Sequence, residues 1–471
     1  MECDCRLTKF IETGAASPAM KISVFAPACL TAFGLTGCLL SGGAASKPGL
    51  LRDANSARNA TTASAQADSL NDSTDAAMTE PAAPKPGELS PASELMIRTC
   101  RNYLAINPQS PKAAEVLNIE ASVYYNNHMY DQSRRIYQRI LTSHPDAPEA
   151  LNSVRMIAQS FQEVGNFEEA EQWYRKLKDQ AKEGGDKQEA IARIAESIFR
   201  MAEKYEEQEK LTEAAAQYER VALEFPESEI ADVALFNAGL VYEKLTSWSH
   251  AILMYQRLMQ KYHEAQLMPK ARFRTAKCHA KLHQWDEAGE MYLRVTANHP
   301  RHELAPAAMY NAGFSFENGG KLIEAAATFE RLAQLYPESE DAADVLFKAG
   351  ELYGKLKEWE SVTRVNTEFS RRFGHDKDRI VQALCMVGVA LYMQEKTSEA
   401  RKQLKEATDT YAHLKNPSTV NKYYAAKARF TLAECDHEAM KEIALQQPRS
   451  VYNRKLNRKA DLLDKAVKSY T

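Results

Sequence analysis

The sequence of 471 residues has little glycine and proline, with 19 Gly and 18 Pro. Because these residues interrupt helices and supply the turns of sandwiches and barrels, their scarcity argues against such all-β folds and favours helices. The chain also lacks an excess of charge of either sign, since 60 Lys and Arg stand against 63 Asp and Glu, for a formal net charge of −3. This balance excludes a protein that binds nucleic acid through a broadly basic surface.

The eight cysteines lack the spacing of a zinc or redox motif. No pair follows the C-x-x-C pattern, and Cys3 and Cys5 form a lone C-x-C pair. Four cysteines are scattered among helical patterns, where a free thiol is expected to be buried as a small apolar group. These four are Cys100, Cys278, Cys385 and Cys435. A disulfide framework is therefore not expected.

Sequence motifs for catalysis and cofactor binding are also missing. There is no P-loop, G-x-G-x-x-G, H-E-x-x-H, G-x-S-x-G or EF-hand pattern. The best metal candidate is Cys278 with His279 and His283, because the two histidines are four residues apart and would share one face of a helix. His279 occupies a position that holds Tyr242 in another repeat, which favours a packing role. We expect no enzyme activity, metal, cofactor or small-molecule substrate, and keep a metal-dependent enzyme as the alternative.

The N-terminal region contains the pattern of a secretion signal. Met20 and Lys21 precede a mostly apolar run over 22–36, which is too short to span a bilayer and typical of a signal peptide. The run ends in Leu35-Thr36-Gly37-Cys38, which resembles a bacterial lipobox. We predict a signal peptide over 1–37 whose true start is Met20, and lipidation of Cys38. An ordinary signal peptide that contains a cysteine is the alternative.

Residues 38–92 are predicted to form a flexible tether behind the lipidated cysteine. From Gly34 to Asn102 there is no aromatic residue, and the segment is rich in Ala, Ser, Thr, Asp and Pro. Such a composition buries too little apolar surface to fold, and its average reach is roughly 40 Å. The residue after Cys38 is Leu39 and not Asp. By resemblance to enterobacterial lipoproteins, this indicates anchoring in the outer membrane, facing the periplasm.

Residues 93–412 repeat with a period of about 37. In each repeat a small residue is followed by an aromatic residue four positions later and an apolar residue three further on, as in Ala251, Tyr255 and Leu258. We expect the one longer step to be absorbed by the loop around Gly184 and Gly185. The small residue recurs at 133, 170, 214, 251, 288, 325, 362 and 400. Such regular spacing predicts stacked copies of one structural unit.

These residues resemble the tetratricopeptide repeat family, in which each repeat is a pair of antiparallel helices. The resemblance implies that a small residue in the first helix allows close approach to the second helix, whose Tyr or Phe fills the adjacent hole. It implies an all-α fold, a TPR-like α-solenoid forming a right-handed superhelix of about eight repeats. The small residues are Gly239, Gly313, Gly350, Gly388, Ala121, Ala158 and Ala276, and the prolines expected to end the second helices are Pro145, Pro226, Pro300 and Pro337.

The resemblance also implies a concave groove lined by the first helices. Position five of these first helices is aromatic in four successive repeats. This aromatic ladder either holds a partner's segment or, as we favour, packs between helices. The ladder comprises Phe236, Phe273, Tyr310 and Phe347. The polar groove candidates are Lys270, Lys277, Glu243, Glu317, Asp344 and Glu351. Their mixed signs indicate a protein partner rather than nucleic acid.

Lipobox, tether and long repeats together resemble the repeat lipoproteins of myxobacterial gliding-motility complexes. The phrases over 225–229 and 336–340 resemble envelope lipoproteins of outer-membrane β-barrel assembly and the Tol-Pal coordinator. We therefore expect a membrane-anchored scaffold that assembles a cell-envelope complex, with gliding motility as the leading process and the other two as alternatives. Residues 413–471 are expected to add C-terminal helices that cap the array, or to be a truncated continuation of it.

Overall fold

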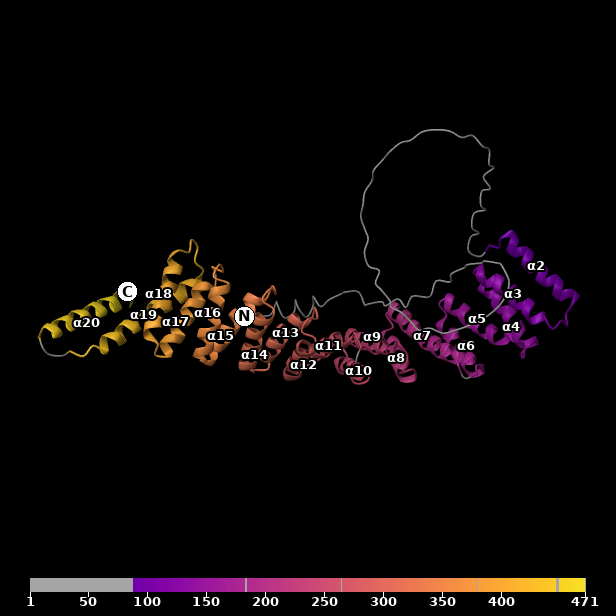
Figure 1. The fold of residues 1–471 in the computed structure, drawn as a ribbon, viewed down its shortest axis with the longest axis horizontal. Helices are drawn as coiled ribbons and strands as arrows, with labels where there is room; N and C mark the ends of the chain where they lie inside the picture. Colours follow the sequence, from indigo (N-terminus) through magenta and orange to yellow (C-terminus); the bar gives the residue numbers. More distant parts are fainter. Residues whose placement is uncertain (1–87, 183, 264, 378, 446–448, 471) are drawn as a thin grey trace, which may run out of the picture. The chain divides into compact units, whose positions relative to one another are not determined.

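The computed structural model describes residues 88–182, 184–263, 265–377, 379–445 and 449–470. Within these ranges the chain forms helices and no strand, and all of the helices belong to one compact unit (Figure 1). The predicted signal peptide, the lipidation site Cys38 and most of the predicted tether lie outside the described residues. In the described part, no helix is both long and apolar enough to cross a membrane.

The helices follow one another as antiparallel pairs after a single leading helix. The first helices carry the glycine or alanine motif, and the second helices from α4 to α14 carry the Tyr or Phe motif, whereas α16 and α18 carry Asn366 and Leu404 at that position. The helices are α2 (Pro91–Ile106), α3 (Ala113–Asn126), α4 (Tyr130–Ser143), α5 (Glu149–Glu163), α6 (Phe167–Gln180), α7 (Gly185–Glu207), α8 (Leu211–Glu224), α9 (Ala231–Lys244), α10 (Trp248–Lys261), α11 (Met268–Lys281), α12 (Trp285–Asn298), α13 (Ala305–Asn318), α14 (Leu322–Leu335), α15 (Ala342–Leu356), α16 (Trp359–Arg372), α17 (Ile380–Met393), α18 (Thr397–Ala412), α19 (Thr419–Lys441) and α20 (Arg449–Tyr470).

Each helix from α2 to α20 packs on the next helix in the chain (Figure 1). First helices of consecutive pairs also meet, as α3 meets α5 and α17 meets α19. The pairs from α3 with α4 to α17 with α18 correspond to the repeats read from the sequence, and α19 with α20 adds a further pair. The all-α solenoid of stacked helix pairs is thus confirmed.

A three-residue turn joins the two helices of a pair, as residues 245–247 join α9 to α10. The middle residue of the turn has a positive φ, which lets the chain reverse direction within so few residues. These middle residues are His128, Gly165, Glu209, Thr246, His283, Gly320 and Glu395, whereas in the two-residue turn between α15 and α16 the first residue, Lys357, has the positive φ. Because His283 lies in this turn and not on α11, the expectation that His279 and His283 share one helix face is wrong.

The connection from one pair to the next is longer and contains the predicted prolines. α8 ends at Glu224 and Pro226 follows, and α14 ends at Leu335 before Pro337. The prediction that these prolines lie just beyond helix ends is confirmed, since proline cannot continue a helix. The next pair also holds this connection in place, because the Tyr262 hydroxyl donates to the Pro226 carbonyl at 2.7 Å.

The long step in the repeat is taken up by a helix rather than a loop. α7 has 23 residues, whereas α9 has 14. The expectation that a loop around Gly184 and Gly185 absorbs the step is therefore wrong, and Gly185 is the first residue of α7. The step from Ala170 to Ala214 is 44 residues, and the seven residues beyond the usual 37 make about two helical turns, which return the side chains to nearly the same face, so α7 still packs on both neighbours.

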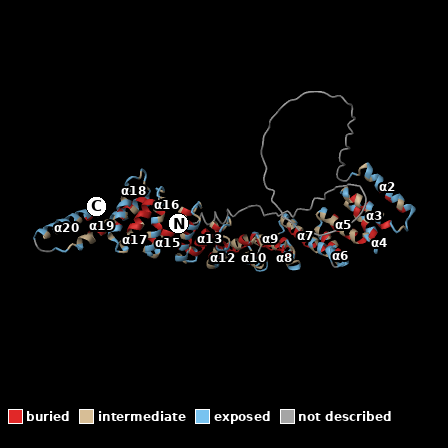
Figure 2. Cartoon of the chain, viewed as in Figure 1, coloured by how far each residue is buried: buried red, intermediate tan, exposed pale blue. Residues whose placement is uncertain are grey.

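The core lies between the helices and continues from pair to pair (Figure 2). Its largest side chains are the ring residues of the second helices, and Tyr255 and Phe329 are fully buried. A Cβ placed on Gly239 would lie 2.6 Å from Cζ of Tyr255, and one on Gly313 would lie 2.6 Å from Cδ1 of Phe329. Each glycine thus provides the space that the ring of the second helix occupies.

Candidate functional site

The predicted aromatic ladder lies against the core rings of the second helices. Phe236, Tyr310 and Phe347 are 8%, 4% and 9% exposed, and Phe273 is half-buried. The ring centroids of Phe236 and Tyr255 are 5.6 Å apart, and each of the other three ladder rings also contacts a ring of its own second helix. Aromatic pairs at such distances stabilise the packing of helices. The structure thus places the ladder between the two helices of each pair, as in the packing interpretation.

Glu243, one of the polar groove candidates, is the centre of a buried network. Its side chain is 7% exposed, accepts a hydrogen bond from the Tyr255 hydroxyl at 2.7 Å and pairs with Arg274 at 3.0 Å and Lys277 at 3.4 Å. Burial raises the pKa of the Tyr255 hydroxyl well above its usual range, and the charge of Glu243 raises it further. The network therefore joins α9, α10 and α11.

Other groove candidates bridge consecutive first helices. Glu317 pairs with Lys348 at 2.9 Å, and Glu351 accepts a hydrogen bond from Gln382 at 3.0 Å. Asp344 pairs at 2.7 Å with Arg379, which also lies over the ring of Phe347. Lys270 is half-buried on α11 and also has an interaction partner. The polar residues brought together on this face therefore hold neighbouring repeats to one another.

The predicted metal candidate residues point to different surroundings. Nδ1 of His279 lies 2.7 Å from Oε1 of Gln284, while His283 contacts the ring of Trp285. Cys278 is fully buried, and burial raises the pKa of its thiol far above the usual range. Over the described residues, no three His, Cys, Asp or Glu side chains are grouped to hold a metal ion. The arrangement at this repeat therefore gives no support to the alternative of a metal-dependent enzyme.

The scattered thiols are all free and buried, as the sequence predicted. They are Cys100, Cys278, Cys385 and Cys435. Burial raises the pKa of Cys385 to about 12 and that of Cys435 to about 11. At neutral pH these groups remain neutral and act as apolar packing atoms.

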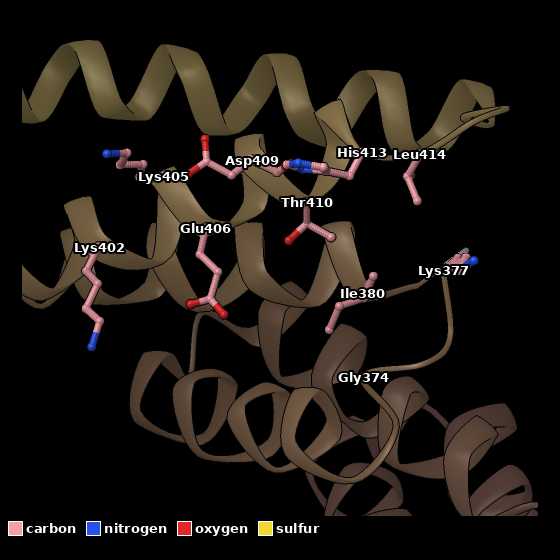
Figure 3. Close-up of a pocket in the computed structure, with 10 residues that line it drawn as sticks. All are labelled: Gly374, Lys377, Ile380, Lys402, Lys405, Glu406, Asp409, Thr410, His413 and Leu414. Atoms are coloured by element: carbon pink, nitrogen blue, oxygen red, sulfur yellow. The ribbon is translucent and has the colours of Figure 1, made fainter.

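Two cavities open beside connections between repeats, and the sequence analysis predicted neither. The larger, about 680 Å³, lies between the 374–380 connection and α18. Figure 3 shows Lys402, Lys405, Glu406 and Asp409 along one helix, with Gly374 and Lys377 on the other side. Because its lining carries both charge signs, this cavity has no strong preference for an ion of either sign.

The smaller cavity, about 530 Å³, lies between α10, the start of α11 and α12. Its described lining includes Arg272, Arg294 and three methionines, with no Asp or Glu. A sequence signal for it existed, because Arg272 stands at a repeat position that holds Leu235 and Leu346 elsewhere. The periodicity of the sequence indicates the positions that repeat. It does not predict this cavity, because residues that depart from the repeat line it.

Comparisons with known proteins agree with the helix pairs. Residues 120–186, 196–228, 270–302 and 307–339 match models described as tetratricopeptide repeat. A comparison with curated proteins gives no match. Within the matched stretches, the pairing of helices and the period along the chain agree with the assignment made from the sequence.

Several solved structures are similar to parts of the chain. BtubC from P. vanneervenii is 16% identical, over 45% of this chain and 89% of that one, with a TM-score of 0.28. YrrB, described as a TPR protein with an unusual peptide-binding site, is 20% identical, over 44% and 95%, with a TM-score of 0.29. The apo form of RapI is 13% identical, over 58% and 99%, with a TM-score of 0.29.

A tetratricopeptide array buries one side of every helix against its neighbours and presents the remaining surface to other proteins. Four stretches of the chain match tetratricopeptide repeats, the helix pairs agree with them, and such repeats imply a scaffold for protein–protein interaction.

Proposed function

We propose that the chain is a lipid-anchored scaffold of the bacterial cell envelope, which holds the proteins of one complex on its repeats. The observation that carries the proposal is the combination of Leu35-Thr36-Gly37-Cys38 after an apolar run with a long array of helix pairs. The array supplies binding surface, and a lipid on Cys38 would supply attachment to a membrane.

The proposed location is the outer membrane, with the array facing the periplasm. Leu39 follows the predicted lipidated cysteine where an inner-membrane lipoprotein of the enterobacterial type would carry Asp. The Ala- and Ser-rich segment that follows would let the array search for partners at a distance from the membrane.

The proposed complex is a gliding-motility complex, because lipobox, tether and long repeats occur together in the lipoproteins that this chain resembles. An accessory role in outer-membrane β-barrel assembly, or in Tol-Pal-like envelope maintenance, is the second candidate. It is favoured by the phrases over 225–229 and 336–340, which resemble the connections of those proteins.

The anchor is tested by replacing Cys38 with Ser in the full chain. The unmodified chain should incorporate an alkyne analogue of palmitate and sediment with membranes, and Cys38→Ser should lose both properties. Cys29→Ser is the matched control, because it removes a thiol from the same segment without touching the predicted lipobox. Equal labelling of Cys38→Ser and the unmodified chain would refute the anchor.

The complex is tested by proximity labelling in the native host, with a biotin ligase fused to the array. Components of the motility machinery should be biotinylated by the unmodified chain and much less by Cys38→Ser. Enrichment of β-barrel assembly or Tol-Pal proteins instead would select the second candidate. Enrichment of cytoplasmic proteins alone would contradict both envelope proposals.

A further inference from the structure

The smaller cavity, between α10, α11 and α12, differs from the other repeat connections in its charge. Arg272 and Arg294 both line it, and its described lining contains no carboxylate. Several other arginines of the array pair with carboxylates, as Arg274 does with Glu243 and Arg257 with Glu219. Two guanidinium groups that face one space without a counter-charge create a positive potential there.

Arg272 occupies a position that the fold otherwise uses for the core. One period away in either direction, the same position holds Leu235 and Met309, which are 4% and 1% exposed, and Leu346 follows at 1%. An arginine at such a position is desolvated by its surroundings, which costs free energy unless a partner compensates. Burial lowers the pKa of Arg272, and the neighbouring charge of Arg294 lowers it further.

His299 also replaces a packing residue. The equivalent positions hold Tyr262 and Tyr336, whose hydroxyls donate to the carbonyl groups of the preceding connections. At His299, Nε2 instead lies 2.9 Å from Nη1 of Arg272. Because a guanidinium only donates, the imidazole must accept through Nε2, which requires its neutral form. This bond holds the Arg272 side chain in place while its other N–H groups stay available.

Methionines supply the apolar part of the cavity. Met259 stands where two other repeats carry Ala222 and Ala333, and Met268 stands where the next repeat carries Ala305. Met291 completes the apolar lining. Flexible thioether side chains adapt to apolar groups of different shapes. Four departures from the repeat pattern, at Met259, Met268, Arg272 and His299, thus meet at a single connection.

We propose that this cavity, which we call the junction site, binds a carboxylate-bearing segment of a partner protein in which an acidic side chain lies beside an apolar one. The two guanidinium groups of Arg272 and Arg294 would hold the carboxylate, and Met259, Met268 and Met291 would contact the apolar neighbour. The site lies between the second helices α10 and α12 and the start of the first helix α11, so it adds a binding surface to the scaffold.

The same chemistry occurs within the chain itself. Residues 68–80 contain Asp68, Asp72, Asp75 and Glu80 together with the apolar Leu70 and Met78 and no basic residue. An acidic segment from another protein and this segment are therefore two sources of one ligand class, and the experiment must distinguish them.

The test measures binding to the full chain by fluorescence anisotropy, with two labelled probes. One is a hexapeptide of alternating glutamate and leucine, and the other is a peptide of residues 68–80. Arg272→Leu restores the residue usual at this repeat position, so the fold should be kept, yet hexapeptide affinity should fall by about tenfold or more. Arg294→Gln should have a similar effect.

Arg257→Gln is the matched control, because Arg257 occupies the helix position of Arg294 one repeat earlier. This variant should leave the affinity for the hexapeptide unchanged. Preferential binding of the 68–80 peptide would identify the chain's own segment as the occupant and overturn the partner proposal. Equal affinity of Arg272→Leu and the unmodified chain would refute the site. Displacement by inorganic phosphate at the same concentration as the peptide would show an unspecific anion site and also refute it.

Discussion

Glu243 is expected to be the most costly single carboxylate to remove from the first helices. Its buried side chain accepts a hydrogen bond from the Tyr255 hydroxyl and pairs with Arg274 and Lys277, so three side chains lose a partner when it is replaced by alanine. Tyr255 is fully buried, and its hydroxyl would have no water to bond with.

The magnitude follows from these contacts. An orphaned buried hydroxyl costs about 1–3 kcal/mol, and the lost pairing of two part-buried cations adds about 1–2 kcal/mol, because both can partly turn to solvent. We expect Glu243→Ala to destabilise this region by about 3–4 kcal/mol. Glu243→Gln keeps an acceptor for Tyr255 and should cost about half as much.

The assay should be local, because an array of repeats sums the stabilities of neighbouring units and need not unfold as one. Hydrogen exchange followed by mass spectrometry reports each helix separately. Glu243→Ala should accelerate exchange in α9, α10 and α11 by about a hundredfold and leave α17 unchanged. Glu317→Ala is the control, because Glu317 occupies the same repeat position and pairs with Lys348, but Phe329 stands where Tyr255 does and has no hydroxyl. The loss of Glu317 should cost about 0.5–1 kcal/mol.

A second substitution, Tyr255→Phe, should restore part of the stability that Glu243→Ala loses. Adding Tyr255→Phe to Glu243→Ala removes the orphaned hydroxyl, so the double variant should be more stable than Glu243→Ala by about 1–2 kcal/mol. Equal losses for Glu243→Ala and Glu317→Ala would refute the argument, because burial would then make no difference. A double variant no more stable than Glu243→Ala would show that the hydroxyl is not the source of the cost.

Further predictions concern turns, packing and ionisation. Thr246 has φ of 55° in its turn, so Thr246→Gly should stabilise the chain by about 0.5–1 kcal/mol, and Gly320→Thr should destabilise it by a similar amount, both measured by thermal unfolding. Gly313→Val would place methyl groups inside an aromatic ring and should cost about 3 kcal/mol in the same assay. The pKa of Tyr255 is raised above its usual 10, so folding stability is complete below about pH 10 and declines above it. The tyrosinate absorbance that the unmodified chain shows beyond a Tyr255→Phe variant should therefore rise together with loss of the helical circular dichroism, and an earlier rise of that difference without unfolding would contradict this. Cys385, buried and with its pKa raised to about 12, should not react with a thiol reagent at pH 8 until the chain unfolds.

The helix pairs could be predicted from the sequence because the residues that packing requires recur in each repeat. Tyr255 and Phe329 are far apart in the chain, yet each lies one helix after a glycine that gives its ring space. A pattern that occurs once can be accidental, but eight copies at a nearly constant spacing indicate a single arrangement of stacked helix pairs. The long step at α7 was misplaced because Gly184 and Gly185 suggest a loop, whereas the helix simply starts there and continues for longer.

The polar contacts between repeats could not be predicted from the sequence in the same way. Whether Glu243 faces solvent or lies under Arg274 depends on the crossing angle and stagger between neighbouring first helices, and no residue pattern encodes these directly. The role of position five of the first helices could not be predicted either, because an aromatic residue there is compatible with a binding groove and with the core. Only the burial of Phe236 in the structure and its contact with Tyr255 separate the two.

Function in a repeat array is better sought in departures from the pattern than in the pattern itself. A residue that recurs at the same position, such as the glycine that faces a ring, is required by packing in every copy and so carries no information about a particular partner. Arg272 and His299 break that requirement together, at one connection, and they contact each other. Because a desolvated guanidinium in a core position lowers stability, its presence calls for a compensating interaction, and the described carboxylates of the chain do not provide one.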